Sequence, residues 1–73
     1  MKTAEMSNIS ENLLALREGK GLTQQALATL AGLPWSVVAK IEQGVTKNPR
    51  LDTLRALAKA LGVTLDRLAG SEE

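Results

Sequence analysis

The chain has 73 residues, with nine Lys or Arg, eight Asp or Glu, and no Cys or His. This length allows one small domain, which buries about 60% of its unfolded surface and leaves little room for an internal active site. Without Cys and His the chain has no disulfide, no thiolate metal site and no imidazole base. We therefore expect no enzyme activity, no catalytic residue, no cofactor and no metal site.

The residue types favour helices along the whole chain. Thirteen Leu and ten Ala dominate the apolar residues, and Trp35 is the only aromatic residue. Leu and Ala are good helix formers. No apolar run approaches the roughly 18 residues of a membrane span, and no signal-peptide pattern is present. We expect an all-α cytoplasmic protein with a flexible arm at 1–8, a compact five-helix bundle at 9–70 and an acidic tail at 71–73.

Polar residues mark the first two helices. Ser10 is predicted to cap a first helix, with Ile9 just outside it, and residues 19–21 are expected to stop this helix. Thr23 is predicted to cap a second helix at residues 24–31, because its hydroxyl can accept from the free amides of the first turn.

A third helix is predicted between Gly32 and Gly44. Gly32 suits the left-handed conformation that ends the second helix. Pro34 suits the first position of the third helix, where a missing amide hydrogen costs nothing. Because a helix advances about 100° per residue, the aliphatic side chains of this segment share one side, which must be buried. The opposite, outward side carries Trp35, Ser36, Ala39, Lys40 and Gln43.

Residues 45–50 are predicted to form a loop before a fourth helix. Gly62 is expected to end that helix, and Thr64 is placed to cap a short fifth helix that runs to Gly70. One stripe of the fourth helix is predicted to face the core: Leu51, Leu54, Leu57, Ala58 and Leu61.

Two short helices joined at Gly32, the second with a solvent-facing side, form a helix-turn-helix pattern. Residues 13–68 resemble the phage repressor/Cro (Xre-type) helix-turn-helix family. The resemblance rests on Leu16-Arg17, Gly21-Leu22-Thr23-Gln24, Leu27-Ala28, Gly32, Ile41-Glu42, Gly44, Pro49, Leu54, Leu57-Ala58 and Leu61-Gly62-Val63. It implies a lambda-repressor-like, five-helix DNA-binding domain, usually dimeric, whose third helix enters the major groove.

The resemblance also implies roles for individual residues. Arg17 and Glu42 occupy positions that form an internal ion pair in family members, and Gln24 matches a phosphate-positioning glutamine. The loop residues that match a stretch gripping the DNA backbone are Thr46, Lys47, Asn48 and Arg50. The residues then expected to read base edges are Trp35, Ser36, Lys40 and Gln43.

Two residues of the third helix depart from the family pattern. Pro34 stands where Ser or Thr usually caps the helix, and Trp35 replaces a more usual polar residue. Trp35 can press its ring on thymine methyls and donate its indole N–H to DNA, or it can be a packing residue covered by the arm or a partner subunit. Specificity is therefore expected to be loose, dominated by apolar contact, or dependent on DNA deformability.

Charge and size suggest the partner. Between residues 17 and 59, seven basic side chains stand against three acidic ones, a distribution that suits a polyanion. We expect a sequence-specific transcriptional regulator, a repressor that binds a palindromic operator in double-stranded DNA as a homodimer. Dimer contacts are expected at the end of the fourth helix and at residues 63–68, with Leu14 and Leu30 as additional candidates. The alternative is a protein-interaction module on the same fold, antitoxin-like or coactivator-like. No membrane contact and no small-molecule ligand are evident from the sequence.

Overall fold

The computed structural model describes residues 9–70, which contain five helices and no strand. The helices are α1 (Ile9–Gly19), α2 (Gln24–Ala31), α3 (Trp35–Glu42), α4 (Leu51–Leu61) and α5 (Leu65–Ala69). The predicted all-α five-helix bundle is therefore confirmed. The predicted arm at 1–8 and acidic tail at 71–73 lie outside the described residues. No helix within residues 9–70 combines the length and the apolar character needed to cross a bilayer.

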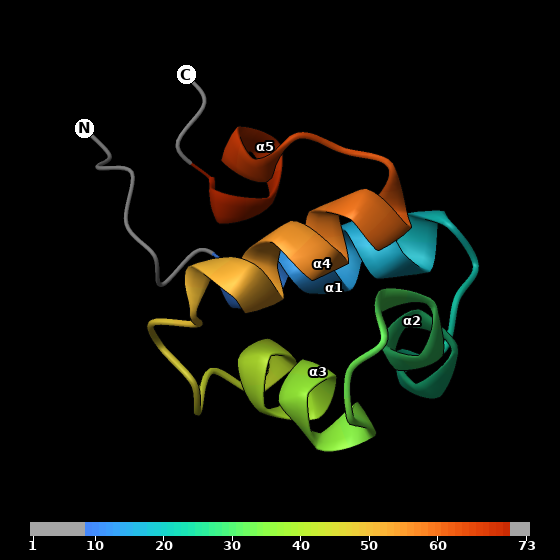
Figure 1. Cartoon of the computed structure of the whole chain (residues 1–73), viewed down its shortest axis with the longest axis horizontal. Coiled ribbons are helices and arrows are strands. Elements are labelled where there is room, and N and C mark those ends of the chain that lie inside the picture. The colour runs from blue at the N-terminus through green and yellow to red at the C-terminus, as the bar shows by residue number, and fades with distance from the viewer. Residues whose placement is uncertain (1–8, 71–73) are drawn as a thin grey trace.

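The five helices pack around a shared core (Figure 1). α2 and α3 pack against each other, α2 also contacts α4, and α3 also contacts α1. α5 packs on α1 and α4, on the side of the bundle away from α2 and α3 (Figure 1). α3 therefore lies at the edge of the bundle, with one side against its neighbours and the other free.

One apolar core joins all five helices. Its largest fully buried side chains are Ile9, Leu13, Leu27, Val38, Ile41, Leu57, Leu61 and Leu68. Burying each such side chain contributes about 1.5–3 kcal/mol. Because every helix supplies at least one of them, none of the five can detach without exposing part of the core.

The helix caps follow the sequence with two exceptions. Thr23 and Thr64 cap α2 and α5, as predicted. The prediction that Ser10 caps α1 was wrong, because Ser10 lies inside the helix. Ile9 is already helical and only 1% exposed, so burial of its side chain places the helical start before Ser10. Pro34 precedes α3 instead of opening it, because its ψ of 146° is extended.

The buried stripe of α4 is shorter than predicted. Leu54, Leu57 and Leu61 are buried, but Leu51 is 52% exposed. Leu51 is the first residue of α4, and helical side chains point back toward the N-terminus of their helix. Its side chain is therefore directed past the end of the packed helix, where no other helix covers it.

Candidate nucleic-acid interface

α3 presents one polar side to solvent. Its four predicted outward residues, Trp35, Ser36, Lys40 and Gln43, are all exposed, as the helical periodicity predicts. On the opposite side Val38 and Ile41 are fully buried. Trp35 is 50% exposed, so half of the indole remains available for contact with a partner.

Ala39 was predicted to lie on this exposed side, and that prediction was wrong. It is only 4% exposed. Ala39 lies one turn after Trp35 and one turn before Gln43, and residues four apart on a helix are neighbours. Its methyl group is short, and the side chains one turn away on either side are longer. Ala39 therefore does not offer a surface for close approach to a groove.

A largely buried ion pair fixes the last turn of α3 to α1. Arg17 Nε donates to Glu42 Oε2 at 2.6 Å, and Arg17 Nη2 donates to Glu42 Oε1 at 3.1 Å. The two side chains are only 12% and 4% exposed. The hydrogen bond to Glu42 raises the pKa of Arg17 above its ordinary value, against the opposing effect of burial. Since each charge neutralises the other, the carboxylate of Glu42 does not oppose a polyanion nearby.

The same carboxylate begins a chain of side-chain hydrogen bonds that ends at Trp35. Gln24 Nε2 donates to Glu42 Oε1 at 2.8 Å. Trp35 Nε1 in turn donates to Gln24 Oε1 at 3.1 Å. The amide of Gln24 thus joins the first and last residues of α3 through the N-terminus of α2. This contact assigns the indole N–H an intramolecular acceptor, which the sequence did not indicate.

The loop after α3 folds back on the end of that helix. Gly44 has a φ of 80°, which only glycine adopts without strain. The amides of Val45 and Thr46 both donate to the carbonyl of Lys40, at 2.9 and 3.2 Å. These bonds place the start of the loop against the base of α3, beside the exposed side of the helix.

Five of the predicted site residues surround one shallow cavity of about 220 Å³. Ser36 and Lys40 line it from α3, and Thr46, Asn48 and Arg50 line it from the loop. Within residues 9–70, Lys40, Lys47 and Arg50 take part in no ion pair. Cationic and hydroxyl donors therefore converge on one surface, which is the arrangement that phosphate oxygens require.

The remaining predicted residues lie elsewhere. Trp35 and Gln24 meet each other, but neither they nor Gln43 and Lys47 line the cavity. Thr53, on the first turn of α4, lines it and was missed by the sequence analysis. The signal in the sequence was its position: Thr53 follows the predicted phosphate-binding Arg50 by three residues, on the first turn of the predicted fourth helix.

The predicted dimer contacts are only partly accessible. Leu61 and Leu68 are fully buried, so neither is free to contact a second subunit. Val63 and Leu65 are half-buried, whereas Leu30 is 62% exposed. No group of three or more His, Cys, Asp or Glu side chains gathers within residues 9–70 to hold a metal ion.

Comparison with known proteins identifies the family. A helix-turn-helix family model matches residues 13–68. An HTH-type transcriptional regulator of Haemophilus influenzae is 42% identical over 55 residues, which are 75% of this chain and 55% of the relative. The immunity repressor protein of Bacillus phage phi105 is 39% identical over 64 residues, covering 88% of this chain and 44% of the repressor.

A solved structure shows the same fold. The crystal structure of the restriction-modification controller protein C.AhdI from Aeromonas hydrophila superposes with a TM-score of 0.80 and 36% sequence identity. The match covers 86% of this chain and 94% of the controller protein. The chain spans about half the length of the two curated relatives it matches. Because the family model matches residues 13–68, which are most of the 73-residue sequence, this chain belongs to the helix-turn-helix family.

Proposed function

We propose that this chain is a sequence-specific DNA-binding transcriptional regulator that places α3 in the major groove of double-stranded DNA. The observation that carries the proposal is the convergence of Lys40 and Arg50 with Ser36, Thr46 and Asn48 around one exposed surface. Glu42, at the end of the same helix, is neutralised by Arg17 and adds no uncompensated negative charge. The relatives described as regulators and repressors support the same conclusion.

Phosphate binding is assigned to the residues at the two flanks of α3. On the loop side they are Thr46, Lys47, Asn48 and Arg50, and on the α2 side Gln24. An amide nitrogen carries two hydrogens, and the structure uses one of those of Gln24 on Glu42. The second remains for a phosphate oxygen, so Gln24 can hold Glu42 and DNA together.

Base reading is assigned to Trp35, Ser36 and Lys40, with Gln43 at the edge. Lys40 can donate to guanine N7 and O6. Trp35 already donates its N–H to Gln24, so its contribution to DNA is the half-exposed ring, which suits thymine methyls. One short helix reads few base pairs, so we propose a homodimer acting as a repressor on a palindromic operator.

The test is selection of binding sites from random duplexes at two salt concentrations. We expect an enriched two-fold symmetric sequence with half-sites about one helical turn apart. The logarithm of the binding constant should fall linearly with the logarithm of the salt concentration, with a slope of about −1 for each phosphate neutralised. Lys40→Ala should change the preferred bases or lower this slope, whereas Lys59→Ala, an exposed lysine of α4, should do neither.

The alternative function is a protein-interaction module in which Trp35 is an interface anchor. Its exposed indole and the exposed Leu30 favour this reading, because interfaces are enriched in aromatic residues around an apolar core. A complex held by these side chains would be almost insensitive to salt. Two results together would favour this alternative over DNA binding. No duplex would be enriched, and a protein would bind the chain through Trp35 with an affinity that does not depend on salt.

A further inference from the structure

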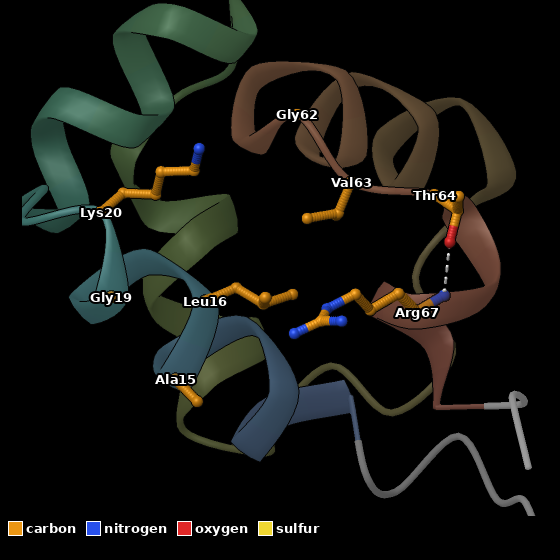
Figure 2. A pocket seen from close by; sticks show the side chains of 8 residues that line it. All are labelled: Ala15, Leu16, Gly19, Lys20, Gly62, Val63, Thr64 and Arg67. Atoms are coloured by element: carbon orange, nitrogen blue, oxygen red, sulfur yellow. Dashed lines mark hydrogen bonds between the residues drawn. The ribbon is translucent and has the colours of Figure 1, made fainter.

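A second cavity lies on the other side of the bundle, away from α3. Its volume is about 640 Å³, within the usual range of roughly 300–1,000 Å³ for small-molecule sites. Residues of α1, of the turn after α1, of the turn between α4 and α5, and of α5 line it (Figure 2). No residue of α3 or of the loop after α3 contributes, so this cavity is separate from the candidate nucleic-acid interface.

Apolar and cationic side chains line the cavity together. Leu16 and Val63 direct their side chains into it, while Lys20 and Arg67 extend toward it from opposite walls (Figure 2). Its lining includes no carboxylate. The ion pair found within residues 9–70, Arg17 with Glu42, involves neither Lys20 nor Arg67.

The ammonium group of Lys20 lies close to Gly62. A Cβ atom at Gly62 would lie 3.8 Å from Lys20 Nζ, which is ordinary contact distance. The ammonium group therefore lies directly beside the main chain of the α4–α5 turn, with no side chain between them. Two like charges facing one apolar cavity repel each other, and an anion placed between them removes that repulsion.

We propose that this cavity binds a small organic dianion, with an apolar middle on Leu16 and Val63 and one acidic group on each of Lys20 and Arg67. A dicarboxylate fits this description, because guanidinium accepts a carboxylate in bidentate geometry and ammonium binds it as a point charge. Such a ligand contacts the first and last helices of the bundle, and no part of the proposed DNA surface is involved.

The probe is adipate, titrated into the ¹⁵N-labelled chain at constant ionic strength and followed by amide chemical shifts. We expect saturable shifts around Lys20, Gly62, Val63 and Arg67. Hexanoate, with one carboxylate, should bind more weakly, and 1,6-hexanediol, with none, should cause no such shifts. Lys20→Gln and Arg67→Gln should each weaken adipate binding about tenfold, the loss expected for one charge-assisted contact. Lys59→Gln is the matched control and should leave adipate binding unchanged.

Several results would overturn the proposal. They are shifts that do not saturate, shifts centred on Lys40 and Arg50, or equal adipate binding by the two cavity variants and the control. If the amide shifts of the cavity residues change when the chain is diluted without adipate, the surface binds a second copy of the chain instead of a small dianion. The amide spectrum of each variant reports whether it is folded, so loss of binding through unfolding is recognised directly.

Discussion

The two helices of the helix-turn-helix begin in different ways. α2 follows Thr23, whose Oγ1 accepts a hydrogen bond from the amide of Ala26 at 3.0 Å. α3 follows Pro34, which is extended and makes no side-chain cap. The first amides of a helix have no partner inside it, so a cap is one of the few protein groups that can satisfy them. α2 has this side-chain cap, and α3 does not.

α3 is supported by its neighbours instead. Its first residue, Trp35, donates to Gln24 of α2, and its last residue, Glu42, accepts from Arg17 of α1. Gln24 also donates to Glu42, so the two ends share one partner. The comparison indicates that α1 and α2 set the orientation of the proposed recognition helix, α3. The start of α2 is set by the residue before it, Thr23.

The largest effect is expected when the tertiary support of α3 is removed. Glu42→Ala should lower the free energy of unfolding by about 3 kcal/mol, because it leaves the largely buried Arg17 without its carboxylate. Urea denaturation measures this loss. Glu18→Ala, which removes an exposed carboxylate from α1, is the matched control and should cost at most about 0.5 kcal/mol. Equal losses in the two variants would show that the ion pair does not hold α3.

Where Glu42→Ala fails to fold, Glu42→Gln supplies the same test in a milder form. The amide retains the shape of the side chain and one acceptor oxygen but removes the charge. It should destabilise the chain less than Ala and more than the Glu18→Ala control. A glutamine variant as stable as the original chain would contradict the role assigned to the ion pair.

A smaller effect is expected at the capped start of α2. Thr23→Ala should cost about 1 kcal/mol, the usual loss when a capping hydroxyl is removed. Thr29→Ala makes the same change within α2, where Thr29 Oγ1 only accepts from the exposed Gln25 at 3.2 Å. Thermal unfolding should separate the two variants by several degrees. If they melt together, the cap does not support α2 and the contrast between the two helix starts is lost.

Features that depend on neighbouring residues along the chain could be predicted from the sequence. The cap at Thr23, the left-handed Gly32 and the buried face of α3 each follow from local chemistry or from helical period, and the structure contains all three. The helix-turn-helix could be identified for the same reason. Its spacing of Gly and apolar residues is set by contacts within a short stretch of chain.

Features that depend on contacts between helices were harder to predict. The bond from Trp35 to Gln24 joins residues eleven positions apart, and neither residue type requires the other. The burial of Ala39 depends on longer side chains around it, and the exposure of Leu51 on where α4 meets its neighbours. The cavity that joins Ser36 and Lys40 to the loop depends on how that loop folds back onto α3. Periodicity gives the direction of a side chain but not what covers it.

The smallest effect on stability is expected at the uncapped start of α3. Pro34→Ser would supply the missing cap, worth up to about 1 kcal/mol, but would also release the restriction that proline places on the unfolded chain, worth about 0.4–1 kcal/mol. The two terms nearly cancel, so stability should change by no more than about 0.5 kcal/mol. Pro49→Ser, in the loop before α4, gains no helix cap and isolates the proline loss.

The same substitution has a separate consequence for DNA. Serine adds a hydroxyl and an amide N–H at the N-terminus of α3, and both can donate to phosphate. Pro34→Ser should therefore bind the selected duplex more tightly while melting at nearly the same temperature. A gain in stability well above 1 kcal/mol would mean that the contacts of Trp35 and Glu42 had left α3 incompletely held. That result would show that the orientation of α3 depends on a local cap.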